Sequence, residues 1–279
     1  MVSEEGVAAE QRSDIDGDKN GDKLCELGLA DDREIAMEWR APALPASSAR
    51  CDIPIVDAAQ LNASALSAYY SEPLLVKGGA IFWPALRRWR RNWMLQTWGD
   101  LLVQLAPNGE RVTLRDFLDE MQQPNVTAPP RFVFQPLTWD WERTPRPRLE
   151  WAHVESDIEL PTFLSGWRRD GEGVRDLGNW FLSVGATSSG QHFHSHGEAL
   201  NAVVWGRKRW FFLAPGSSVR ASDYASGLEF ARGLPEIRRE GASVAECIQE
   251  RGDVVIVPAQ LPHAVVNDGD TVSVSLDRV

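Results

Sequence analysis

Four of the five histidines of this 279-residue chain lie at two places, and these places constrain the fold more than any other feature. His192, His194 and His196 alternate along one stretch, and His263 follows much later in the chain. Because side chains alternate between the faces of a strand, an extended segment would project the first three to one side. A sheet that also brings His263 beside them would present several imidazoles to one metal ion.

Short apolar runs separated by turn residues fill the chain after Asn179. They predict strands at 180–184, 199–205, 209–214, 253–257 and 271–276, after two earlier strands at 52–57 and 73–78. Regularly spaced short strands are typical of a β-sandwich or jelly roll rather than of an α/β fold. We therefore expect a mainly β architecture.

Two helices are expected between the early strands and the later ones. Residues 84–99 carry Leu86, Trp89 and Trp93 at three- and four-residue spacing, which predicts one helix with its tryptophans in the core and its arginines in solvent. A second helix should begin after Thr113, whose hydroxyl is of the kind that caps helix N-termini. Its apolar face would consist of Leu114, Phe117, Leu118 and Met121.

The first fifty residues differ in composition from the rest. Up to Arg40 there are twelve Asp and Glu against five Lys and Arg, a local net charge of -7 out of the total of -11. We interpret residues 1–50 as an acidic, disordered tail and residues 51–279 as one domain. Asp16 to Asp22 has the alternating oxygens of a calcium loop, but Leu27 stands where a bidentate glutamate is needed, so a solvated tail is preferred.

Composition also excludes several classes of protein. The net charge of -11 argues against a general nucleic-acid binder. No run approaches 18 apolar residues, so we expect no membrane span. Cys25, Cys51 and Cys247 are too few and too scattered for a disulfide framework or a cysteine metal site, which favours a reducing compartment. The first ten residues lack the apolar core of a secretory signal, so a cytoplasmic or nuclear location is expected.

His194, His196 and His263 would form a three-point face that leaves coordination positions open for substrate and oxygen. Non-heme iron oxygenases use such a face, usually with two histidines and one carboxylate. The alternative, in which these histidines only satisfy one another's hydrogen bonds, is less favoured for three imidazoles on one face. Strand alternation, barring a bulge, points Lys208 into the same cavity, although a surface lysine is the other interpretation.

Two motifs carry a family resemblance. The segment from Gly252 through Pro258 and His263 to Asn267 resembles the second cupin motif. His194-Ser-His196-Gly197, followed by Gly206-Arg-Lys208-Arg-Trp210-Phe211, resembles the JmjC (jumonji C) branch of cupin-like proteins, and within it the jumonji-domain-containing protein 8 type. The resemblance covers roughly residues 51–279.

That resemblance implies a double-stranded β-helix, a cupin-like jelly roll with flanking N-terminal helices. It implies an Fe(II)- and 2-oxoglutarate-dependent oxygenase that uses O2, with a protein side chain as the substrate to be hydroxylated. Carried over by position, His194, His196 and His263 match the metal triad and catalytic centre. Lys208 matches the lysine that pairs with the distal carboxylate of 2-oxoglutarate, and Asn267 matches a position beside that cosubstrate. The resemblance further suggests a monomer, and it adds the secretory lumen as an alternative location.

His196 departs from the family pattern, because most active members carry Asp or Glu there. Three neutral imidazoles leave Fe(II) with one more net positive charge. The alternatives are therefore a catalytically weak or inactive JmjC-like adaptor that acts through protein contacts, and a cupin metal enzyme that does not use 2-oxoglutarate. A second register would restore a carboxylate through Glu198, with His192, His194 and His263. We favour the first register because its distance to Lys208 fits the JmjC family.

Overall fold

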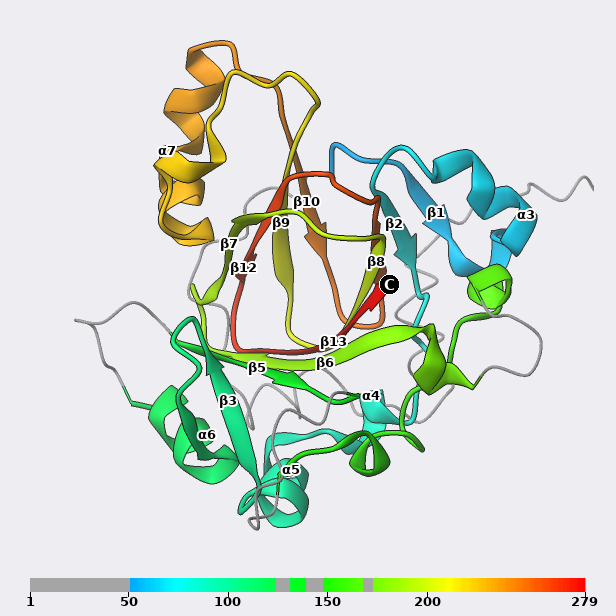
Figure 1. Cartoon of the computed structure of the whole chain (residues 1–279), viewed down its shortest axis with the longest axis vertical. Coiled ribbons are helices and arrows are strands. Elements are labelled where there is room, and N and C mark those ends of the chain that lie inside the picture. The colour runs from blue at the N-terminus through cyan, green and yellow to red at the C-terminus, as the bar shows by residue number, and fades with distance from the viewer. Residues whose placement is uncertain (1–50, 124–130, 139–147, 168–172, 279) are drawn as a thin grey trace, which may run out of the picture.

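The computed structural model describes residues 51–123, 131–138, 148–167 and 173–278. Within these ranges the chain is mainly β, with two sheets and short helices (Figure 1). The predicted acidic tail and its calcium-like loop lie outside the described residues. None of the helices in the described ranges combines the length and the apolarity needed to span a bilayer.

The larger sheet has nine strands in the order β1-β2-β11-β8-β13-β6-β5-β3-β4. β1 and β2 run parallel, and the other neighbours run antiparallel. The strands are β1 Ile55–Asp57, β2 Leu74–Lys77, β3 Leu102–Ala106, β4 Arg111–Thr113, β5 Phe132–Pro136, β6 Gly178–Gly185, β8 Ala199–Trp205, β11 Val254–Val257 and β13 Thr271–Arg278.

The smaller sheet has four antiparallel strands in the order β10-β9-β12-β7. Its strands are β7 Gly190–His194, β9 Lys208–Leu213, β10 Val244–Gln249 and β12 His263–Asn267. From β6 to β13 the chain therefore crosses repeatedly between two facing sheets, which is the topology of a double-stranded β-helix. The predicted fold class is confirmed, including helices that precede these strands.

Helices cover the outer faces of both sheets (Figure 1). α4 Ala85–Arg88, α5 Arg91–Trp98 and α6 Leu114–Met121 lie against the larger sheet, α3 Ala63–Leu66 lies near β1, and α7 Gly227–Arg239 lies against β7 and β12. Short 3-10 helices occur at Ala58–Gln60, Ser67–Tyr69, Trp151–His153, Thr162–Trp167, Val174–Leu177 and Ala221–Asp223.

The helix predicted at 84–99 is two helices. Trp89 and Arg90 leave the helical conformation, with ψ angles of 51° and 154°. The buried carboxylate of Asp157 holds this break, since it accepts hydrogen bonds from the Trp89 indole at 2.8 Å and from Arg88 at 2.5 Å. Trp89 is buried as expected. The second predicted helix is confirmed: the Thr113 hydroxyl accepts a hydrogen bond from the amide of Asp116 at 3.1 Å.

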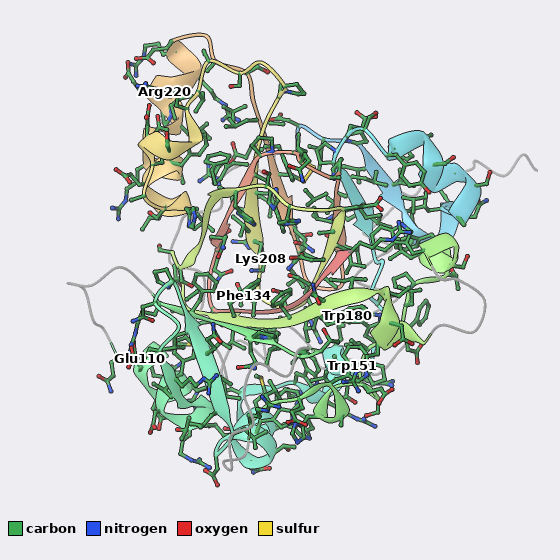
Figure 2. The ribbon with its side chains drawn as sticks, viewed as in Figure 1. Glu110, Phe134, Trp151, Trp180, Lys208 and Arg220 are labelled. Carbon is green, nitrogen blue, oxygen red and sulfur yellow. A yellow bond between two sulfur atoms is a disulfide. The ribbon has the colours of Figure 1, made fainter. Side chains whose placement is uncertain are left out.

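Three apolar clusters form the core. The largest lies between the larger sheet and its helices, and it contains Trp151 and Trp180, visible below that sheet in Figure 2. The second lies between α7 and the outer face of the smaller sheet, where Phe193 meets Phe230 with ring centroids 4.6 Å apart. The third combines side chains of both sheets, such as Phe212 and Val255, and so fills part of the space between them.

The interpretation of the cysteines requires a correction. Cys51 and Cys247 form a disulfide across 196 positions of sequence, which joins the segment before β1 to strand β10. The amide of Asp52 also donates a hydrogen bond to the carbonyl of Glu246 at 2.7 Å. Scattered spacing therefore did not exclude a disulfide, because the two cysteines become cross-strand neighbours only in the folded chain.

Candidate functional site

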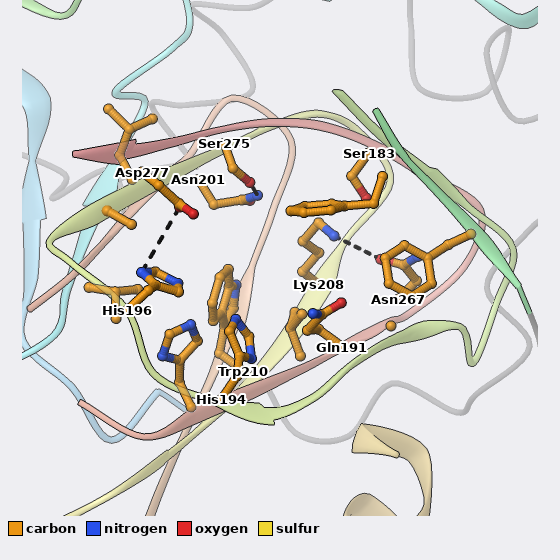
Figure 3. A pocket seen from close by; sticks show the side chains of 18 residues that line it. Ser183, Gln191, His194, His196, Asn201, Lys208, Trp210, Asn267, Ser275 and Asp277 are labelled. Carbon is orange, nitrogen blue, oxygen red and sulfur yellow. Dashed lines mark hydrogen bonds and ion pairs between the residues drawn. The ribbon is translucent and has the colours of Figure 1, made fainter. Parts of the chain in front are cut away.

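A cavity of about 260 Å³ lies between the two sheets. Its lining comes from β5, β6, β7, β8, β9, β11, β12 and β13, together with His196 just beyond β7 (Figure 3). The lining includes all five residues that the sequence predicts for the site: His194, His196, Lys208, His263 and Asn267.

Strand register brings the three predicted metal ligands together. His263 on β12 pairs directly with His194 on β7, and their ring centroids lie 4.3 Å apart. His196 follows two residues after the end of β7, and its ring centroid lies 4.9 Å from that of His263. One ligand atom from each ring lies within 4.8 Å of the other two. The three nitrogens are thus close enough to share one metal ion.

Backbone carbonyls fix the tautomer of all three rings. Each Nδ1 lies 2.8 Å from a carbonyl oxygen: His194 from that of His192, His196 from that of Gly197, and His263 from that of Leu261. A carbonyl oxygen only accepts, so each Nδ1 carries the proton and donates it. Each Nε2 therefore has its lone pair available, which is the state in which a histidine binds a metal.

Burial also keeps two of these rings neutral. It lowers the pKa of His194 to about 4 and, with the neighbouring His194, lowers the pKa of His263 to about 3. Desolvation penalises the charged imidazolium, whereas the neutral ring is what a metal ion requires. At neutral pH these two side chains need lose no proton to become ligands.

His192 does not join the other three, which corrects the expectation that strand alternation projects it to the same side. His194 pairs with His263 and Gln191 pairs with Val265. Three residue steps along β7 therefore lie opposite two residue steps along β12. This β-bulge shifts the phase of the alternation. His192 is exposed and outside the cavity lining, while Phe193 packs against α7.

Lys208 and Asn267 form a second polar group in the cavity. They are directly paired across β9 and β12, and the Lys208 ammonium donates a hydrogen bond to Asn267 Oδ1 at 3.0 Å. The amide of Asn267 donates to the hydroxyl of Ser189 at 2.9 Å, so its orientation is fixed. Burial lowers the pKa of Lys208 to about 7. Among the described residues no carboxylate pairs with this lysine.

Glu198 and the fifth histidine of the chain, His153, lie elsewhere. Glu198, required by the second register, forms an ion pair with Arg278 at 2.7 Å and does not line the cavity. His153 is exposed, and its Nδ1 accepts a hydrogen bond from the amide of Glu150 at 2.9 Å. Of the two registers, the first is the one whose histidines the structure brings together.

Sequence reasoning missed several polar residues in the cavity. Asn201 is buried on β8 and donates to the hydroxyl of Ser275 at 2.9 Å, while its own Oδ1 has no hydrogen-bond partner among the described residues. Ser275 and Asp277 face the cavity from β13 (Figure 3). Two signals could have found them: one asparagine within an apolar strand, and polar residues alternating with apolar ones along β13.

The two facing sheets and the histidine cluster inside them define a cupin-like protein with a candidate metal site. Residues 181–277 match the family model described as "JmjC domain, hydroxylase". The resemblance to the JmjC family drawn from the motifs is therefore confirmed over residues 181–277.

Curated relatives agree with this assignment at low identity. Over 225 residues the chain is 24% identical to "Arginine-specific demethylase JMJ22" of Arabidopsis thaliana, covering 74% of this chain and 41% of the relative. Over 94 residues it is 29% identical to "JmjC domain-containing protein 8" of Homo sapiens, covering 34% of this chain and 36% of the relative. Over 138 residues it is 25% identical to "2-oxoglutarate and iron-dependent oxygenase JMJD4" of Mus musculus, covering 44% of this chain and 32% of the relative. The chain thus spans less than half the length of each of these relatives.

Proposed function

We propose that this protein is an Fe(II)- and 2-oxoglutarate-dependent oxygenase that hydroxylates a side chain of a protein substrate. The family match and the names of the JMJD4 relatives support the oxygenase class. The observation that carries the proposal is the three clustered imidazoles whose Nδ1 atoms all donate to carbonyls, because this leaves an Nε2 lone pair available on each ring of a group close enough to hold one metal ion.

In this proposal His194, His196 and His263 hold the metal. Their donor set fits iron, since imidazole is a suitable ligand for it and the site contains no thiolate among the described residues. Bound Fe(II) would supply the redox chemistry by which O2 oxidises both 2-oxoglutarate and the substrate. The chain's own contribution is to keep the rings neutral, oriented and partly shielded from water.

Lys208 would bind one carboxylate of 2-oxoglutarate. An ammonium has three donor positions, and Asn267 occupies one of them. A buried cation without an anionic partner is costly, so an anionic ligand offsets that cost. Apolar lining from Phe134, Val257 and Val265 lowers the dielectric around the pair and so strengthens it.

Binding of 2-oxoglutarate to the full-length protein tests the proposal. With Fe(II) added under anaerobic conditions, we expect saturable binding in a calorimeter and its loss in Lys208→Met, which removes the charge but keeps most of the volume. The matched control is Arg220→Met, which removes an exposed cation outside the cavity lining (Figure 2). No binding at millimolar 2-oxoglutarate, or equal binding by Lys208→Met, would overturn the proposal.

His196 favours a second candidate, a JmjC-like adaptor that keeps the fold and a metal but acts through protein contacts. Most active members of the family that this sequence resembles carry a carboxylate at this position. The imidazole of His196 is therefore the specific observation behind this alternative. Metal content and partner binding of His194→Ala and His263→Ala separate the two. Partner binding that survives the loss of both imidazoles would favour the adaptor.

A further inference from the structure

Among the described residues that line the cavity, Asp277 is the one that is acidic. It lies on β13, where Ser273, Ser275 and Asp277 alternate with Val272, Val274 and Leu276. The three apolar residues pack into the large core, so the other face of the strand looks into the space between the sheets. Asp277 therefore points inward because of the strand's alternation (Figure 3).

The carboxylate of Asp277 lies beside the ring that replaces the family's carboxylate. Its Oδ1 is 4.0 Å from Nδ1 of His196, which is too long for a hydrogen bond but short for an interaction between charges. Within the described ranges no lysine or arginine pairs with Asp277. Glu198, by contrast, is neutralised by Arg278.

The half-buried carboxylate of Asp277 lacks a cationic partner, and the three-histidine metal site lacks a carboxylate ligand. The negative charge of Asp277 would therefore balance part of the charge of a bound metal ion. A divalent metal held by three neutral imidazoles keeps its full charge of two, and in a partly dry cavity a nearby anion lowers its free energy. Carboxylates that act on a metal through its histidine ligands commonly raise its affinity. Asp277 would act through its charge and not through a hydrogen bond, because it lies 4.0 Å from a ring Nδ1 that already donates to the Gly197 carbonyl.

We propose that Asp277 supplies from β13 the negative charge that His196 does not contribute, and that it stabilises the bound metal from beside the imidazole cluster. Asp277 is then a positioning residue for the metal rather than a fourth member of the cluster. This inference rests on the metal-binding part of the proposed function.

Metal affinity, measured without turnover, tests it. The full chain would be titrated anaerobically with Fe(II) and with Co(II) against a chromophoric chelator. We expect Asp277→Asn to weaken binding by about 10- to 100-fold and Asp277→Glu to restore most of it. The matched control Glu198→Gln removes the same charge from a neighbouring but paired carboxylate and should bind as the wild type does.

A double-mutant cycle separates a charge effect from a structural one. His196→Asp places a carboxylate in the cluster itself, so in that background Asp277→Asn should cost much less than in the wild type. If Asp277→Asn does not fold, as judged by circular dichroism, Asp277→Ser continues the serine pattern of β13 and takes its place in the same cycle.

The outcomes are distinct. A wild type that binds neither metal removes the proposed function and this inference together. A wild type that binds metal while folded Asp277→Asn binds equally well removes this inference alone, as does a loss of affinity seen only in Glu198→Gln. An equal cost of Asp277→Asn in both backgrounds also overturns it, because a purely structural effect would not depend on His196.

Discussion

Lys208 has a protonation state that depends on the cavity's contents. Burial lowers its pKa to about 7, and an anionic ligand beside the ammonium would raise that pKa again. Binding of a dicarboxylate should therefore take up a proton whenever the pH exceeds 7. Because of this lysine, the cavity should bind an anionic ligand more tightly in neutral or slightly acidic solution than in alkaline solution.

We predict that the affinity for 2-oxoglutarate falls as the pH rises from 7 to 9, approaching about tenfold per pH unit, since only the protonated lysine binds the anion. Calorimetry in buffers of different ionisation enthalpy would measure the proton uptake directly. An affinity that stays flat to pH 9 would contradict the assigned role of the lysine.

The two neutral histidines make a prediction about acid stability. The pKa of His194 is about 4 and that of His263 about 3 in the folded chain, below their ordinary value of 6.5. Between these values and pH 6.5 the unfolded chain binds protons at these histidines and the folded chain does not. The free energy of unfolding therefore decreases as the pH falls below 6.5. Each ring contributes up to about 1.4 kcal/mol per pH unit.

Urea unfolding of the metal-free protein at pH 7 and pH 5 should show this loss. A His194→Gln variant should lose part of the pH dependence, while His192→Gln, which changes an exposed ring, should keep it. Equal pH dependence of the two variants would show that burial of His194 is not the cause.

At the residue scale the sequence predicted the cluster better than its surroundings. His194, His196, Lys208, His263 and Asn267 could be placed from motif spacing and not from strand alternation alone, because a bulge interrupts the alternation of β7 and His196 lies beyond the end of that strand. Asp277 could not, since its significance comes from its distance of 4.0 Å to His196, which lies far from it in the sequence. Motifs indicate ligands, while compensating charges arise from tertiary structure.

At the scale of elements, the bulge in β7 decides which histidines face the cavity. The strand carries one residue more than β12 between the pairs His194 with His263 and Gln191 with Val265. Removing His192 would leave two steps on each strand. Gln191 and His194 would keep their strand partners, and Phe193 would still lie between them on the α7 side. The Gln191 carbonyl would then stand two residues before His194, the position from which the His192 carbonyl accepts from His194 Nδ1.

We therefore predict that deletion of His192 is tolerated. The variant should fold and should bind Co(II) with nearly wild-type affinity. Deletion of Phe193 is the contrasting change, because it removes the ring that packs on Phe230 and should destabilise the fold by about 3–5 kcal/mol. Loss of metal binding on deletion of His192 would argue that this residue belongs to the site after all.

Other elements show why local sequence signals have limits. The strands with clear apolar runs were predicted, whereas α7 and strands β3, β4, β5 and β10 were not. The break between α4 and α5 depends on Asp157, which is far from both helices in the sequence. The helical spacing of apolar residues continues across the break, so it could not be predicted from that spacing. Contacts distant in sequence decide such boundaries.

At the scale of the whole molecule, one covalent bond joins the beginning of the described chain to the smaller sheet. The disulfide between Cys51 and Cys247 closes a loop of 196 positions. Such a link restricts the unfolded chain, and disulfides typically contribute about 2–4 kcal/mol. Trp210, which lines the cavity, is the partner of Cys247 in the pairing of β9 and β10.

Cys51→Ser is therefore expected to lower the free energy of unfolding by about 2–4 kcal/mol under oxidising conditions and to have little effect under reducing ones. Denaturant unfolding with and without a reductant would measure both values. Thiol trapping of protein taken from its own cells would show whether the bond is present there, as expected for an oxidising compartment. An equal effect in both conditions would indicate that packing of the cysteine, rather than the bond, matters.

The position of β13 has a consequence for the order in which the molecule is made. β13 lies between β8 and β6 in the larger sheet, and it pairs with both along most of its length. While the chain is being synthesised, those two strands emerge long before the one that joins them. The cavity consequently has no closed wall, and Asp277 no place beside His196, until that strand has left the ribosome. Stable metal loading should thus follow the emergence of β13 rather than precede it.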